Sequence, residues 1–336
     1  MRAIQLNNDQ KQLLGFNSSQ IFRCTFSGRP CDMTNDFRSY YSYSRGNCFT
    51  YNSGLTQNNT PTPLKTIELD GQQYGLSLII APLLNSNKYP TSYSNGLKVY
   101  IHNQTFQASS SDGFYLEPGK ETTIAVRKTI TNNYPAPYSE CTDLSSSATS
   151  KSSQLYTYIV LTKNKTYRQY DCFNLCLQRA IEMSCGCFWA RYDHIDNETF
   201  QCFNLTHLEC IKKEQAEFNE LICIDECPLE CDSTTYSLQA SMLEFPSRQM
   251  YDVFKREVTL ANYSYTYEMY KESVLALNIF YPYAQYTRIT ESPKTTPIDL
   301  LSQIGGSLGM CVGFSLFHAI EVGEILFLMA YISLKK

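Results

Sequence analysis

The sequence has little charge and few of the residues that enzymes use for catalysis. Only 18% of its 336 residues are charged, the net charge is -4, and there are four histidines and one tryptophan. No run of lysine and arginine provides the basic surface that a nucleic-acid partner requires. The histidines are scattered, and the sequence contains neither a nucleophile elbow nor a phosphate-binding loop. We therefore expect no enzyme, no cofactor and no metal site.

The beginning of the chain lacks an apolar stretch. Residues Met1 to Gln10 are mostly polar and do not contain the apolar core of a signal peptide. The cysteines and sequons described next place residues 1–298 outside the cell. We therefore expect a first membrane segment upstream of Met1.

Cysteine is abundant: 13 of the 14 cysteines precede residue 299, and Cys311 follows. The chain also has N-x-S/T sequons at Asn17, Asn58, Asn103, Asn164, Asn197, Asn204 and Asn262. Together these features indicate an oxidising exterior where glycans are added. Because 13 is an odd number, one cysteine has no partner within the chain, and we expect Cys48 to pair with a cysteine upstream.

The spacing of the other cysteines favours disulfides over zinc. Cys24 and Cys31 flank a turn that suits a local bridge. Cys172 and Cys176 lie on one face of an expected helix, and the same spacing recurs at Cys223, Cys227 and Cys231, so two such rows could be joined like rungs. The alternative is a zinc site drawn from Cys185, Cys187, His194, Cys202, His207 and Cys210. The oxidising compartment makes that alternative weaker.

A long apolar stretch ends the chain. Between Ile304 and Ile332, 29 residues at about 1.5 Å per residue exceed a hydrocarbon core of about 30 Å, which predicts one transmembrane helix. Gly305, Gly309 and Gly313 recur every fourth residue, a pattern that lets helices approach closely. Acids at membrane depth normally face protein or water, so Glu321 and Glu324 favour a pore over a simple anchor.

Several ordered motifs resemble those of the degenerin/epithelial sodium channel family. They are Gly46-Asn-Cys48, Asn52-Ser-Gly54, Tyr74-Gly-Leu-Ser77, Gly96 to Gln104, Tyr138-Ser-Glu-Cys141, Cys185-Gly-Cys187, Cys227-Pro-Leu-Glu-Cys231, Phe245-Pro-Ser247 and Leu300 to Gly306. The resemblance covers nearly the whole chain. It implies a membrane protein with an α+β extracellular domain, made of a β-rich palm and β-ball and a helical, disulfide-stapled thumb, followed by one C-terminal transmembrane helix.

The resemblance also implies domain boundaries. It divides the chain into 1–52 (end of the finger and return to the palm), 53–137 (palm and β-ball strands), 138–231 (cysteine-rich thumb), 232–297 (knuckle and palm strands and wrist), 298–334 (second transmembrane helix) and 335–336 (start of the cytoplasmic tail). The disulfides it implies are Cys24-Cys31, Cys141-Cys231, Cys172-Cys227, Cys176-Cys223, Cys185-Cys210 and Cys187-Cys202.

The resemblance further assigns roles to individual residues. Gly313, Phe314 and Ser315 match the family's Gly-x-Ser selectivity belt, whose middle residue is usually small. Ser302, Gly305, Gly309, Glu321 and Glu324 match pore-lining or gating positions. Tyr138 matches the aromatic residue through which the thumb contacts the wrist.

The expected function is a pore-forming subunit of a trimeric, sodium-selective, amiloride-sensitive-type, ligand-gated cation channel in the plasma membrane. Its expected partners are the lipid bilayer, related subunits in a homo- or heterotrimer, and an extracellular ligand or peptide. Sodium is the permeant ion, and no cofactor or nucleic acid is involved. The alternative is a disulfide-rich, membrane-anchored receptor or adhesion domain without a pore, which would have no use for Glu321 and Glu324.

Overall fold

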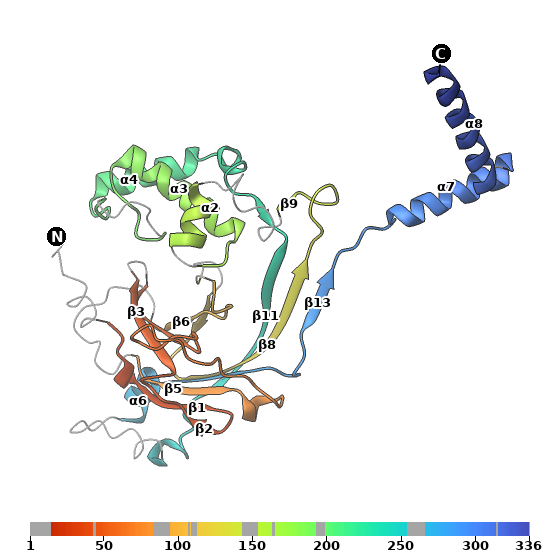
Figure 1. The fold of residues 1–336 in the computed structure, drawn as a ribbon. Helices are drawn as coiled ribbons and strands as arrows, with labels where there is room; N and C mark the ends of the chain where they lie inside the picture. The colour runs from red at the N-terminus through yellow and green to blue at the C-terminus, as the bar shows by residue number, and fades with distance from the viewer. Residues whose placement is uncertain are drawn as a thin grey trace.

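A seven-stranded mixed sheet forms the body of the molecule (Figure 1). The computed structural model describes residues 15–42, 45–82, 95–106, 108, 113–142, 154–162, 165–192, 199–253, 266–313 and 315–335. The strand order is β11-β8-β12-β5-β1-β2, and β13 also pairs with β8. The strands are β1 (Ile21–Phe26), β2 (Arg29–Pro30), β5 (Leu76–Ile80), β8 (Lys120–Asn132), β11 (Asp232–Glu244), β12 (Leu275–Phe280) and β13 (Thr287–Thr290).

The long strand β8 organises this sheet. Along one edge it pairs with β11 over its whole length in antiparallel register, from Asp232 opposite Asn132 to Glu244 opposite Lys120. Along the other edge it pairs in parallel first with β12 and then with β13. Two short strands therefore share the length of β8 on this side. Residues 281–286 between them form no strand, and Pro282 has no N–H to donate to a neighbouring strand.

The core of the sheet is aliphatic and follows the alternation of the strands. Ile124 and Val126 on β8 point to one face and are buried with Leu78 of β5 and with Leu275 and Leu277 of β12. Leu277 is 1% exposed. Burying such side chains stabilises the fold by about 25 cal/mol for each Å² of apolar surface removed from water.

Smaller elements surround the sheet. They are the paired strands β3 (Phe37–Ser42) and β4 (Gly46–Tyr51), β6 (Leu97–Val99) and β7 (Phe114–Leu116), and β9 (Cys141–Thr142) and β10 (Leu229–Glu230), with the short helices η1 (Ser18–Gln20), η2 (Gln72–Tyr74) and α6 (Tyr267–Ser273). The β9/β10 pair joins the sheet to the helical region, because Cys141 and Cys231 form a disulfide there.

A helical region, residues 154–227, lies to one side of the sheet (Figure 1). It contains α2 (Gln154–Thr157), η3 (Tyr158–Thr162), α3 (Gln169–Cys185), α4 (Leu205–Glu217) and η4 (Glu220–Cys223). Four disulfides join its parts: Cys172-Cys227, Cys176-Cys223, Cys185-Cys210 and Cys187-Cys202. With Cys24-Cys31 and Cys141-Cys231, they are the six pairs that the resemblance implied.

The C-terminal apolar stretch differs from the prediction. Instead of one continuous helix, the structure has α7 (Pro297–Val312) and α8 (Leu316–Leu334), and α8 turns sharply away from the direction of α7 (Figure 1). By length and composition, α8 contains a candidate membrane span, Phe317–Leu334. The sequence predicted one helix because apolar residues continue through 304–315, whereas the backbone leaves the helical conformation at Gly313 and Ser315.

Candidate functional site

The start of α7 is fixed by a capping box. The Oγ1 atom of Thr296 accepts the Asp299 N–H at 3.1 Å, and Asp299 Oδ2 accepts the Thr296 N–H at 3.0 Å. Pro297 occupies the first turn, where it has no N–H to leave unsatisfied. These residues therefore set where the connector from β13 ends and the apolar helix begins.

The end of α7 is a left-handed turn at Gly313. Its φ and ψ are 66° and 18°, and its N–H bonds to the Gly309 carbonyl at 3.1 Å. A residue with a Cβ atom rarely adopts this conformation, so the glycine allows the helix to end here. Gly313 therefore serves as a helix cap, whereas the sequence placed it in a helix-contact stripe with Gly305 and Gly309.

Ser315 is the N-cap residue that precedes α8, and it has extended backbone angles. The Ser315 side chain does not cap a backbone N–H; its Oγ atom bonds instead to Nδ1 of His318 at 2.8 Å. Sequence reasoning missed His318. The spacing of three residues from a serine at a helix start could have indicated it, since positions three apart in the first turn lie on one face.

The break between the helices leaves backbone polar groups outside helical bonding. In a bilayer, such groups are tolerated where they are buried in protein or line a water-filled cavity. Gly313 and Ser315 therefore offer carbonyl and hydroxyl oxygens at this point, the kind of ligand that can replace part of the hydration shell of an ion. Phe314, the third predicted belt residue, lies outside the described residues.

The predicted pore-lining residues lie on these two helices. Ser302, Gly305 and Gly309 are exposed on α7, and Glu321 and Glu324 are exposed on α8. Apolar side chains are exposed beside them: Met310 is 89% exposed and Phe317 is 76% exposed. An apolar surface of this extent requires cover from lipid or from other helices.

Tyr138 lies close to the connector that leads to α7. Its ring packs edge-on against Tyr134, with 5.1 Å between the ring centroids. The Tyr134 N–H donates to the Glu291 carboxylate at 3.2 Å, and the Glu291 N–H donates to the Asn132 carbonyl at 2.9 Å. Tyr138 thus reaches the connector through Tyr134, a residue that the sequence did not single out.

The structure argues against zinc binding at the candidate ligands that lie closest together. Ligand atoms of Cys187, Cys202 and His207 lie within 4.8 Å of one another. The two sulfurs form a disulfide, however, so they are not the thiolates that zinc binds. His194 lies outside the described residues.

Cys48 is half-buried on β4 and is not part of a disulfide within the described residues. Burial raises the pKa of its thiol, and burial also raises the pKa of the neighbouring Tyr40 to about 12. The thiol is therefore neutral in this chain, and its pairing with an upstream cysteine stays a prediction.

Four of the predicted glycosylation sites fall in described parts of the chain. Asn17, Asn58 and Asn204 are exposed, and Asn103 is half-buried. Asn164, Asn197 and Asn262 lie outside the described residues.

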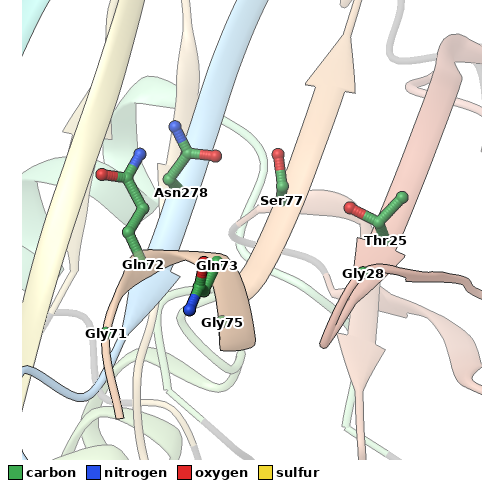
Figure 2. Close-up of a pocket in the computed structure, with 8 residues that line it drawn as sticks. All are labelled: Thr25, Gly28, Gly71, Gln72, Gln73, Gly75, Ser77 and Asn278. Carbon is green, nitrogen blue, oxygen red and sulfur yellow. The ribbon is translucent and has the colours of Figure 1, made fainter.

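An open, uncharged pocket of about 580 Å³ lies on the large sheet, at one end of β1, β5 and β12 (Figure 2). Thr25, Ser77 and Asn278 are direct partners across the three strands, so their side chains share one face. Gln72 and Gln73 of η2 complete its polar lining. The amide nitrogen of Asn278 donates to Glu121 at 2.7 Å, which fixes its orientation. This pocket was not predicted from the sequence, because its residues are separated by up to 253 positions.

Comparison with known proteins identifies the family. The family described as "Amiloride-sensitive sodium channel" matches residues 2–325. Epithelial sodium channel subunit alpha of Mus musculus is 30% identical over 322 residues, which cover 94% of this chain and 44% of the mouse protein. The Pelodiscus sinensis subunit alpha is 30% identical over 314 residues (92% and 46%). Degenerin mec-10 of Caenorhabditis elegans is 27% identical over 338 residues (98% and 44%).

The chain spans less than half the length of these relatives. The matched region includes the disulfide-rich domain, α7, the break and the first part of α8, and the predicted resemblance is confirmed. The chain belongs to the amiloride-sensitive sodium channel family, whose members are plasma-membrane ion channels with a large extracellular domain and not enzymes.

Proposed function

We propose that this chain forms the pore of a trimeric, sodium-selective, ligand-gated channel. The observation that carries the proposal is the break at Gly313 and Ser315 between two apolar helices. A membrane anchor needs one uninterrupted helix, whereas a filter needs backbone and hydroxyl oxygens that face the ions. The proposed assembly is a homo- or heterotrimer of related subunits in the bilayer.

Ion conduction through this segment requires no chemical reaction. The Gly313 carbonyl and the Ser315 hydroxyl replace part of the hydration shell of sodium at the constriction. Glu321 and Glu324 lie six and nine residues beyond Ser315 on α8 and attract cations to the path. We expect Phe314 to pack between subunits, because an apolar ring on the axis would obstruct hydrated ions.

Gating acts through the connector. Strand β13 is paired with β8 of the large sheet and continues through residues 291–296 into α7. Pro293 and Pro297 limit the conformations of this connector. A ligand or peptide that shifts the exterior domain would therefore move α7, and with it the break. Tyr134 donates a hydrogen bond to Glu291 of the same connector, and Tyr138 packs against Tyr134.

A chimeric channel tests the proposal. Residues 296–335 replace the corresponding segment of the mouse alpha subunit, and currents are recorded in mixed sodium and potassium. We expect sodium-selective current that is blocked by amiloride. Ser315→Ala should shift the reversal potential, and Glu324→Gln should lower conductance, because neutralising symmetric acids removes a local attraction for cations.

Ser333→Ala, at the far end of α8, is the matched control and should leave the reversal potential unchanged. Phe314→Ala should preserve sodium preference and loosen assembly. A chimera that reaches the surface without conducting contradicts the proposal. So does a Ser315→Ala variant that behaves like the Ser333→Ala control.

A further inference from the structure

An exposed apolar patch surrounds the start of α4. It consists of Phe200, Phe203, Leu205 and Leu208, whose exposed fractions are 53%, 63%, 78% and 44%. Single exposed apolar side chains are normal on a protein surface, but here four of them fall within nine residues. Exposed apolar patches of this kind are usually covered by another group.

The aromatic part of this patch has a defined geometry. The rings of Phe200 and Phe203 lie 6.1 Å apart, and both contact His207, at 5.7 and 5.3 Å between centroids. The backbone N–H of Phe203 also donates to His207 Nδ1 at 3.4 Å. The disulfide between Cys187 and Cys202 anchors the chain beside them. The two phenylalanine rings are therefore held in place while they remain exposed.

A sequon lies within the patch: Asn204-Leu205-Thr206. Asn204 is exposed, and its Oδ1 atom accepts the His207 N–H at 2.7 Å as the N-cap of α4. A glycan is attached to the other atom of this amide, Nδ2. Capping and glycosylation therefore use different atoms of one side chain, and the cap holds the amide next to Phe203.

The other described sequons lack this setting. Asn58 is followed by polar residues in an exposed turn, and Asn103 is half-buried. Asn17 follows an aromatic residue, but that residue, Phe16, packs edge-on against Phe49 at 5.2 Å and is only partly exposed. Of the four sequon asparagines in the described ranges, Asn204 is the one beside exposed aromatic rings.

We propose that Asn204 carries an N-linked glycan whose first sugars lie over Phe203 and Phe200 and cover the patch. The apolar C–H face of a pyranose ring fits the face of an aromatic ring, through dispersion and weak C–H contacts. A lipid-linked oligosaccharide diphosphate supplies the glycan: its sugar C1–O bond breaks, the C1–Nδ2 bond forms, Nδ2 loses one proton, and the lipid diphosphate leaves. The transfer involves no oxidation or reduction. The occupant is a glycan and not a protein partner, because a glycan on Asn204 would obstruct close docking at these rings.

Three variants separate the glycan from the cap and the rings. Thr206→Ala removes the acceptor sequence and keeps the Asn204 cap. Asn204→Asp keeps a capping oxygen and removes Nδ2. Phe203→Ala keeps the sequon and removes one ring. Asn58→Gln is the control, because it removes a sequon from a polar turn.

The experiment uses the full chain, directed into the secretory pathway by an added signal peptide, in a glycosylating eukaryotic cell. Peptide mapping after enzymatic deglycosylation in heavy-oxygen water reports occupancy at each asparagine, and a dye that fluoresces on apolar surfaces reports exposure of the patch. We expect most copies to be glycosylated at Asn204. Enzymatic deglycosylation of the folded protein, Thr206→Ala and Asn204→Asp should each raise dye fluorescence about twofold or more.

Asn58→Gln should not raise the fluorescence, and adding Phe203→Ala to Thr206→Ala should lower it again. Deglycosylating the already folded protein keeps the test valid if a variant fails to fold. Two results overturn the proposal: an Asn204 that is mostly unmodified in the mature protein, or a Thr206→Ala variant that binds no more dye than Asn58→Gln.

Discussion

The sheet and the helical region are stabilised in different ways. The main core of the sheet is built from aliphatic side chains on neighbouring strands, among them Ile124, Val126 and Leu277. The core of the helical region combines apolar side chains with two disulfides, because Cys172, Cys176, Cys223 and Cys227 are buried in one cluster with them. The sheet contains one short-range disulfide, Cys24-Cys31, whereas the helical region contains four.

The difference follows from the amount of core that each region can form. Strands of the sheet bury side chains against several neighbours at once, whereas α3 packs mainly on α4 and on short turns. A small region with few apolar contacts gains most from cross-links that restrict its unfolded state. Redox conditions should therefore affect the helical region more than the sheet.

The largest expected effect is the loss of Cys172-Cys227. This bridge closes a separation of 55 residues, and removing it through Cys172→Ala with Cys227→Ala should cost about 4 kcal/mol by chain entropy. Removing Cys24-Cys31, with a separation of 7, should cost about 2 kcal/mol. Trp189, the single tryptophan, lies in the helical region, so its fluorescence during denaturant unfolding measures the first loss. Equal losses for the two bridges would contradict the comparison.

The second effect concerns the aliphatic core. Leu277→Ala should lower the free energy of unfolding by about 3 kcal/mol, because it leaves a cavity in the sheet. Denaturant unfolding followed by circular dichroism, with and without reductant, measures this loss. Leu161→Ala, at a position 75% exposed in the helical region, is the control and should change stability by less than about 0.5 kcal/mol. A Leu277→Ala variant as stable as this control would show that the sheet does not rely on its core.

A smaller effect is expected at the end of α3. Gly186 has φ of 67°, and a Cβ atom added there would meet open space. Gly186→Ala should therefore cost about 1 kcal/mol, from backbone conformation alone. Gly186→Asn, which tolerates left-handed angles better, should cost less. Thermal unfolding followed by Trp189 fluorescence distinguishes the two, and an alanine variant more stable than the asparagine variant would exclude a conformational role.

The smallest effect concerns pH where the two regions meet. Burial lowers the pKa of His102 below its usual value, and the charges of Lys165, Arg168 and Arg45 lower it further, while its bond to the Asn103 carbonyl opposes this change. The unfolded chain therefore takes up a proton that the folded chain does not, so stability is lost as pH falls below about 6.5. His102→Gln should reduce the drop in melting temperature between pH 7.5 and 5.5. An unchanged drop would show that His102 does not contribute to it.

The family, the exterior location and the presence of a C-terminal apolar segment followed from the sequence. These three features could be predicted from local sequence patterns, because each sequon, cysteine row or family motif spans only a few residues. The strand positions around Leu76–Ile80 and the helix over Gln169–Cys185 were also predictable, because alternation and helical periodicity come from neighbours in the chain.

By itself, the sequence determined that residues 304–332 are apolar enough to enter a membrane, that Glu321 and Glu324 interrupt them, and that Cys172 and Cys176 share a helix face. Only the tertiary structure decided that the apolar stretch forms two helices. The hydropathy of a sequence does not report backbone angles or hydrogen bonds, such as the left-handed angles of Gly313 and the bond from Ser315 to His318. It also decided which strands meet β8, and that Asn204 and the exposed phenylalanines share one surface. The pairing around β8 depends on contacts between segments that are distant in the sequence. The exposure of Phe200 and Phe203 depends on what the rest of the fold leaves uncovered. A local sequence pattern contains neither kind of information.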